Sequence, residues 1–286
     1  MHAAKIIADS ISPDCVRLTT MEVVMPRIIL AEFNTHRMFS RNSASSRAIP
    51  VEKMLKMVQE NPYIPIHWGK NQKGMQADQE VNELDAKWAR QSWLWARDNA
   101  VQRANELLNV GIHKQITNRL LEPFMWHTVI VTATEWSNFF HLRNHEAAHP
   151  DMRLVARAMQ FEYEKDINGP EYVDYGEWHL PYITLEEENN YTQQSCIEAS
   201  IMRCARVSYL THEGGCDIEA DSQAYQKRLL APGHMSPLEH PATPIAKVFG
   251  AGAMWSGNFR GWKQYRKTIE GEADIFGHRK NNAKTR

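Results

Sequence analysis

The stretch that decides the fold is Val16-Arg-Leu-Thr-Thr-Met-Glu-Val-Val-Met25, which ends at Pro26. It is rich in β-branched residues and partly alternates apolar with polar positions, which predicts a β-strand. A second β-branched run, residues 128–134, predicts another strand or the start of a buried helix. Residues 28–39 predict a short helix, because proline is well accepted in the first turn of a helix. The Ser- and Asn-rich residues 41–50 predict a loop.

Apolar residues then recur at helical spacing in three further segments: 85–121, 151–166 and 195–209. Together with the strands they predict an α/β (α+β) fold, a central sheet with helical excursions at 85–121 and 151–166. We expect one domain over residues 1–286, with insertions around 51–110 and 167–194.

The composition is that of a globular chain, with 43% hydrophobic and 23% charged residues. Lys+Arg 33 against Asp+Glu 34 gives a net charge of −1, which argues against a nucleic-acid-binding protein but leaves a local anion site open. No apolar run approaches the roughly 18 residues of a membrane span, and residues 1–14 lack the apolar core of a secretory signal. The cysteines (Cys15, Cys196, Cys204 and Cys216) are too scattered for a disulfide framework. We expect a cytoplasmic protein that binds neither nucleic acid nor membrane.

Two motifs in the sequence are weighed against simpler interpretations. His145-Glu-Ala-Ala-His149 matches the zinc-peptidase pattern H-E-x-x-H, in which both histidines lie on one helix. Pro150 follows at once and favours a helix that begins there, so we predict no metal site. Glu162 or Glu164 would be the third ligand if the motif were real.

Gly250-Ala-Gly-Ala253 resembles the start of a dinucleotide-binding loop, but Trp255 stands at the third glycine position. A simple loop is the better interpretation of these residues.

The segment Thr35-His-Arg-Met-Phe-Ser-Arg-Asn-Ser-Ala-Ser-Ser-Arg47 is the strongest candidate site. It holds one histidine, three arginines and four serines in thirteen residues. A helix end followed by a serine-rich turn exposes N–H and hydroxyl groups, and arginines bind anions in a bidentate manner. Phosphate or a nucleotide is the ligand that this chemistry favours, and a solvated loop stays open as the alternative.

This segment resembles the signature of the flavin-dependent thymidylate synthases, R-H-R-x-x-S-x-N-E-x-S-x-R-Y. The chain keeps six of the family's residues: His36, Arg37, Ser40, Asn42, Ser45 and Arg47. It departs from the pattern at Thr35, Ser43 and Ala48.

Three further segments extend the resemblance. Residues 138–153 contain Asn138-Phe-Phe-His-Leu-Arg143 and Ala148-His-Pro-Asp-Met-Arg153, similar to N-F-x-x-L-R…A-Q-x-E-I-R. Residues 205–209 (ARVSY) and 233–240 (GHMSPLEH) are similar to A-R-x-S-[FY] and G-H-x-[ST]-P-x-E-H. In the family these last two segments precede the R-H-R segment, whereas here they follow it. We therefore expect a circular permutation, in which the strand at 16–25 follows His240 in space but not in sequence.

The resemblance implies the methylation of dUMP to dTMP, with FAD as cofactor and with methylenetetrahydrofolate and NADPH as co-substrates. It implies a homo-oligomer, a tetramer in the family, with sites between subunits. Arg153 would be catalytic, facing the pyrimidine carbonyl edge. The implied substrate-binding residues are Ser43, Ser45, Arg47 and Arg153. The implied cofactor-binding residues are His36, Arg37, Met38, His141, Arg143, Ser208, His234, Ser236 and Glu239.

The departures from the pattern leave alternatives open. Gln264 and Arg266 form a Q-x-R element in the tail, and we hypothesise that the tail returns to the site and supplies the lost substrate-binding side chains. A solvated basic helix is the alternative for this segment. Because Thr35 and Ser43 replace an arginine and a glutamate, the enzyme could instead hydroxymethylate a pyrimidine deoxynucleotide. A nucleotide- or flavin-binding protein without turnover is the alternative of another class.

Overall fold

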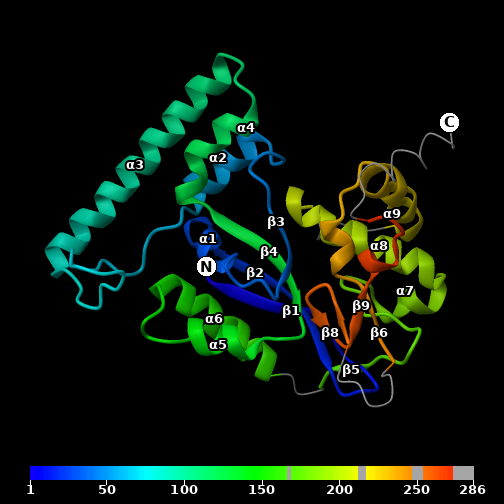
Figure 1. The fold of residues 1–286 in the computed structure, drawn as a ribbon. Helices are drawn as coiled ribbons and strands as arrows, with labels where there is room; N and C mark the ends of the chain where they lie inside the picture. The colour runs from blue at the N-terminus through cyan, green and yellow to red at the C-terminus, as the bar shows by residue number, and fades with distance from the viewer. Residues whose placement is uncertain (166–168, 212–216, 247–253, 273–286) are drawn as a thin grey trace.

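A five-stranded sheet lies at the centre of the computed structural model (Figure 1), which describes residues 1–165, 169–211, 217–246 and 254–272. Its strand order is β3-β4-β2-β1-β5. The strands are β1 (Ala3–Ile11), β2 (Arg17–Pro26), β3 (Ser40–Ser43), β4 (Trp126–Ala133) and β5 (Glu171–Tyr172). All neighbours are antiparallel except β5, which pairs parallel with the end of β1.

Helices and short strands surround this sheet, which confirms the expected mixed α/β class. The α-helices are α1 (Leu30–Phe33), α2 (Val51–Glu60), α3 (Glu83–Asn109), α4 (Lys114–Thr117), α5 (Ser137–Arg143), α6 (Pro150–Glu164), α7 (Leu185–Asn190), α8 (Gln193–Arg206) and α9 (Ile218–Tyr225). Shorter elements are the 3-10 turns η1 (Arg27–Ile29), η2 (Asn118–Phe124), η3 (Val207–Tyr209), η5 (Ser236–Glu239) and η6 (Tyr265–Thr268), the π-helical turn η4 (Gln226–Leu230), and the strands β6 (Ala242–Pro244), β7 (Trp255–Ser256), β8 (Phe259–Arg260) and β9 (Trp262–Gln264). Among the described residues, no helix is both long enough and apolar enough to cross a bilayer.

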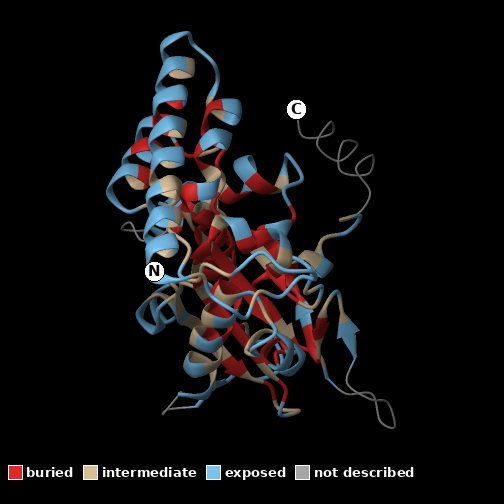
Figure 2. Ribbon diagram, turned by 90° about the vertical axis from the view of Figure 1, so that its left-hand side faces the viewer, coloured by how far each residue is buried: buried red, intermediate tan, exposed pale blue. Residues whose placement is uncertain are grey.

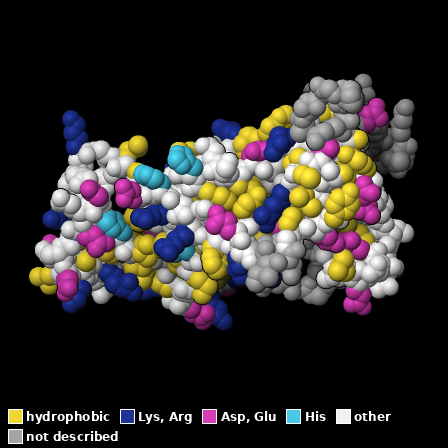
Figure 3. Space-filling model, turned by 90° about the horizontal axis from the view of Figure 1, so that it is seen from below, with side chains coloured by type: hydrophobic (Ala, Val, Ile, Leu, Met, Phe, Trp, Pro, Cys, Tyr) yellow, Lys and Arg dark blue, Asp and Glu magenta, His cyan; other side chains and the backbone are white. Residues whose placement is uncertain are grey.

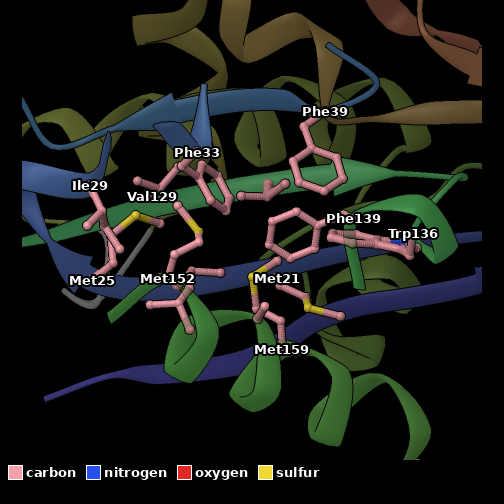
Figure 4. Close-up of a cluster of buried hydrophobic side chains, with 14 of the residues drawn as sticks. Met21, Met25, Ile29, Phe33, Phe39, Val129, Trp136, Phe139, Met152 and Met159 are labelled. Atoms are coloured by element: carbon pink, nitrogen blue, oxygen red, sulfur yellow. The ribbon is translucent and has the colours of Figure 1, made fainter. Parts of the chain in front are cut away.

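One face of the sheet is apolar and packs against α1, α5 and α6. Met21 and Met25 of β2 and Val129 of β4 are fully buried on this face. Figure 4 shows Met152 and Met159 of α6 reaching toward these strands, with Phe139 of α5 beside them. Because alternate residues of a strand point to opposite faces, one face of β2 and β4 forms this core.

The opposite face meets the C-terminal part of the chain. Ile130 of β4 packs against Cys204 and Val207, which follow one another along α8 and η3. Leu18 at the start of β2 packs against Ala242 and Trp262 of the small β6–β9 pair. Figure 1 shows α8, α9 and these short strands on the right of the sheet.

A third group of elements, α2, α3, α4 and η2, packs beyond the sheet, next to the start of β4. Val58 of α2, Ala104 of α3 and Leu121 of η2 are buried together. Figure 2 shows that α3 otherwise exposes most of its length. The helix α3 confirms the helix expected from residue 85. Gly111, two residues after the end of α3, has φ +80.

Pro150 is the first residue of α6, and the side chain of His149 caps the helix by accepting from the Asp151 N–H. This confirms that the helix starts at Pro150, as the proline required. His145 lies in the turn between α5 and α6, so the two histidines of the H-E-x-x-H match do not share a helix. The described residues hold no group of three or more His, Cys, Asp or Glu that could bind a metal.

Several local expectations need correction. Residues 41–50 were expected to be a loop, but residues 41–43 belong to the edge strand β3, because its backbone pairs with β4 from Ser40↔Thr132 to Ser43↔Val129. The segment expected as an insertion around 167–194 contains α7, which begins with a capping box between Thr184 and Glu187. Gly250–Ala253 and Cys216 lie outside the described residues.

Candidate functional site

The serine turn, defined as residues 44–50, follows β3 and meets the A-R-x-S segment. The backbone N–H of Ser45 donates to the carbonyl of Ser208 at 2.9 Å. The Ser45 carbonyl in turn accepts from the N–H groups of Ala48 and Ile49 at 2.9 and 3.1 Å, which closes the turn. Segments about 160 positions apart in sequence are therefore neighbours.

His36 and Arg143 form a second group beside α1. The Nε of Arg143 donates to Nε2 of His36 at 2.8 Å, and its Nη1 is paired with Glu32. Burial, together with the positive charges of Arg143 and Arg41, lowers the pKa of His36 to about 4. The ring is neutral at pH 7, and because Nε2 accepts a hydrogen bond, the proton resides on Nδ1.

Arg41 connects this group to the segment 233–240. Its Nη1 donates to the carbonyls of His36 at 3.1 Å and Phe33 at 3.4 Å. Burial lowers the pKa of Arg41, Arg37 lowers it too, and the negative charge of Glu239 raises it. η5, which carries Glu239, packs against β3.

The tail returns to these signature segments, as hypothesised. The Nε2 of Gln264 donates to Ser40 Oγ at 3.0 Å and to Asn258 Oδ1 at 2.8 Å. Arg266 Nη1 pairs with Glu239 Oε1 at 2.6 Å. The segment that carries Gln264 and Arg266 is β9 followed by a 3-10 turn, with Gln264 buried, so it is not a solvated basic helix.

Other predicted residues lie at the surface. Arg37, Arg47 and Arg153 are exposed, and each lacks a hydrogen bond or ion pair from its guanidinium within the described part of the chain. His234 and Ser236 are exposed as well, and Met38 and Ser43 are half-buried.

Two predicted residues are not brought together with the rest. Arg153 lies on the first turn of α6, and no hydrogen bond or ion pair between described residues joins it to the serine turn. His141 lines a cavity of about 720 Å³ between α5 and α6, together with Trp136 and Tyr163. The side chains of Phe139 and Arg143 on the same helix instead meet His36.

A buried polar chain crosses the sheet and ends at the last residue of the segment 233–240. Ser10 Oγ and Thr20 Oγ1 bond the two ring nitrogens of His179 at 2.8 and 2.7 Å. Thr20 Oγ1 bonds Thr132 Oγ1 at 2.7 Å, and Thr132 Oγ1 bonds Nδ1 of His240 at 2.8 Å. Burial lowers the pKa of both histidines to about 3, so both are neutral.

Sequence reasoning missed Arg41, Glu32 and Asn258 as parts of this region. Arg41 falls at a variable position of the signature, and only the density of arginines in residues 35–47 pointed to it. Asn258 carries no signal of its own, because its place beside Ser40 depends on the return of the tail.

Figure 3 shows the face of the molecule seen from below, where cationic and acidic side chains are interspersed. This face therefore carries no broad basic surface.

The fold and the clustered signature segments define an α/β protein with arginine and serine groups suited to an anionic ligand. The family model described as thymidylate synthase complementing protein matches residues 17–167, and the chain belongs to this family. Membership supports methylation of a pyrimidine nucleotide at the level of the family. The match runs across residues 51–110, which were expected from the sequence to be an insertion.

Comparisons with solved structures list a UMP/dUMP methylase, PolB from Streptomyces cacaoi. Its complex with 5-Br UMP is 16% identical with a TM-score of 0.47, covering 58% of this chain and 89% of that chain. Its complex with 5-Br dUMP is 17% identical with the same TM-score, covering 58% and 90%. The curated proteins that were compared give no match.

Proposed function

We propose that this protein is a flavin-dependent enzyme that converts dUMP to dTMP, with methylenetetrahydrofolate as one-carbon donor and NADPH as reductant. The observation that carries the proposal is the meeting of separate signature segments in one chain. The Ser45 N–H bonds the Ser208 carbonyl, and Arg41 bonds the His36 carbonyl beside Glu239. We place the reaction in the cytoplasm.

The residues present fit an FAD molecule near His36. Arg37 is exposed and free of a carboxylate within the described chain, which suits a diphosphate. The neutral His36 offers an Nδ1–H donor, held in place by Arg143. His36, Arg37, Met38 and Arg143 would hold the cofactor, with Ser208, His234, Ser236 and Glu239 from the other segments and a weaker contribution from His141. FAD, when bound, supplies hydride and one-carbon transfer.

The serine turn would hold the nucleotide. Ser45 and Arg47 offer hydroxyl and guanidinium donors to a phosphate, and Ser43 lies beside them on β3. Arg153 would face the pyrimidine carbonyl edge and stabilise the negative charge that develops when the ring is activated. Because no hydrogen bond or ion pair between described residues joins Arg153 to the serine turn, we infer that a homotetramer completes each site from different subunits.

The tail takes part as a support of the substrate site. Gln264 fixes Ser40 of the signature, and Arg266 fixes Glu239. Both bonds support the hypothesis that the tail compensates for the glutamine and arginine that Glu32 and Thr35 replace.

We also infer that the chain forms a single, circularly permuted catalytic domain. Ala242, two residues after the segment 233–240, packs against Val16 and Leu18 at the start of β2. This contact supports the spatial continuity that the permuted order requires.

The test is to purify the protein and measure its flavin absorbance, then supply dUMP, methylenetetrahydrofolate and NADPH and determine the mass of the nucleotide product. We expect bound flavin and a product heavier by one methylene unit. A product that carries a hydroxymethyl group in place of the hydrogen at carbon 5 would indicate hydroxymethylation instead. Bound flavin without any product would make the protein a nucleotide- or flavin-binding protein without turnover.

A further inference from the structure

The serine turn is held from behind by a single buried side chain, Asn118. This residue opens η2 and is completely buried. Its Nδ2 donates to the carbonyl of Ser46 at 2.7 Å and to that of Ile49 at 2.9 Å. Both neighbours are acceptors, which fixes the orientation of the amide group. Asn118 therefore pins the middle and the end of the turn at the same time.

Two more side chains of the same segment bond the turn. Lys114 Nζ donates to the carbonyl of Ala48 at 2.7 Å, and Glu122 Oε1 accepts from Ser46 Oγ at 2.6 Å. Lys114 begins α4, and Asn118 and Glu122 lie in η2 directly after it, so consecutive turns of this segment supply all of these contacts. Lys114 thus bonds one carbonyl of the turn, Asn118 bonds two carbonyls, and Glu122 bonds a hydroxyl.

The three bonds from Asn118 and Lys114 use carbonyls of the turn, those of Ser46, Ala48 and Ile49. Arg47 is left at the surface, exposed and without an ion pair among the described residues. A site whose backbone is fixed before binding loses less conformational entropy when its ligand arrives. Holding the turn from behind is thus a means of pre-forming the phosphate site of the proposed reaction.

We propose that Asn118, assisted by Lys114 and Glu122, is a positioning residue that pre-forms the serine turn for the phosphate of the nucleotide. The proposal rests on the proposed function and adds to it a set of residues that touch neither substrate nor cofactor. It predicts that these side chains set the affinity for a phosphorylated nucleoside and have little influence on flavin binding.

The decisive variant is Asn118→Ala, studied as the flavin-loaded protein. It leaves the carbonyls of Ser46 and Ile49 without their donor, and we expect the Kd for dUMP to rise about tenfold. Flavin content and kcat at saturating dUMP should stay near the wild-type values. Binding of deoxyuridine, which lacks the phosphate, should not change. Asn105→Ala is the matched control, since its Nδ2 bonds only the Val101 carbonyl within α3.

Two further variants keep the proposal testable if Asn118→Ala does not fold. Lys114→Met removes a partly exposed donor while keeping the length of the side chain, and should raise the Kd for dUMP by a smaller factor. Glu122→Ala should also raise it, whereas Glu122→Gln retains an oxygen that can accept from Ser46 Oγ and should restore the affinity.

The outcomes separate this inference from the proposed function. If the wild-type protein binds no dUMP and yields no methylated product, the proposed function fails. If the wild-type protein binds dUMP and the folded Asn118 and Lys114 variants bind it equally well, the positioning role fails alone. A lower melting temperature with an unchanged Kd would assign Asn118 a structural role only, which also overturns the inference.

Discussion

The two faces of the central sheet are stabilised in different ways, and neighbouring residues of β2 illustrate this. Met21 points into the apolar core formed with α5 and α6. Thr20, on the other face, bonds Thr132 and His179 in the buried polar chain. The shape and volume of side chains determine the first environment, whereas hydrogen bonds between buried polar side chains determine the second.

The apolar face therefore mainly stabilises the fold, whereas the polar face mainly fixes the position of a motif segment. The apolar face is a packed core that includes Phe139 and Met152 of the motif segments. The polar chain leads to His240, the last residue of the segment that carries Glu239. Because a hydrogen-bonded chain accepts one geometry, it fixes that segment relative to β4.

Breaking the apolar face should have the largest effect on stability. Met21→Ala removes a completely buried side chain, and we expect the free energy of unfolding to fall by about 3 kcal/mol. Urea unfolding measures this loss. The folded fraction should keep the wild-type Kd for dUMP, and a weaker affinity would show that the two faces are not separable.

Breaking the polar face should cost somewhat less stability but should reach the site. Thr20→Val keeps the shape of the side chain and leaves His179 and Thr132 short of a partner, which should lower the free energy of unfolding by about 2 kcal/mol. The rate of dTMP formation should fall as well, since Thr132, which bonds Nδ1 of His240, loses its bond to Thr20. Unfolding and kinetics indistinguishable from wild type would contradict this role for the polar chain.

Acid should weaken the polar face, in addition to the effect of His127 of β4, whose pKa is also lowered to about 3, chiefly by burial. His179 and His240 have pKa values lowered to about 3 by burial, against about 6.5 in the unfolded chain. The unfolded state therefore binds more protons below pH 6.5. Stability is fully present above that pH and is lost as the pH falls toward 3, by about 1.4 kcal/mol per pH unit for each histidine.

Urea unfolding between pH 7 and pH 5 checks this dependence. His240→Gln removes one of the two groups and should reduce the slope. A slope equal to that of the wild type would mean that His240 is not buried as a neutral ring.

The smallest effects should come from ion pairs near the surface of the polar side. Arg266→Ala leaves Glu239 without its partner, and we expect kcat/KM for dUMP to fall about fivefold, which corresponds to about 1 kcal/mol. Arg260→Ala removes a similar pair with Glu135 and is the control. It should change the free energy of unfolding by no more than about 0.5 kcal/mol. Unchanged kinetics of Arg266→Ala would show that the tail does not contribute to the site.

Much of the fold follows from the sequence, because local patterns determine it. The β-branched residues 16–25 predicted β2, and Pro150 correctly predicted the first residue of α6. The strand β3 was missed because its polar residues carry no strand pattern. Its pairing with β4, and not its own propensity, makes it a strand.

Site residues that belong to sequence motifs could be predicted. Residues that reach the site only through tertiary contacts could not. The signature identified His36 and Ser45, and the tail motif identified Gln264. The support behind the serine turn was not predictable, because Asn118 and Glu122 have no meaning until α4 and η2 are placed against residues 44–50.

The most direct test of the central claim is the release of tritium from dUMP labelled at carbon 5, measured with the flavin-loaded protein, methylenetetrahydrofolate and NADPH. The account predicts release that depends on all components, and release by Arg47→Ala only at much higher dUMP concentrations. No release by a folded protein that contains flavin and binds dUMP would contradict the claim that this site methylates a pyrimidine nucleotide.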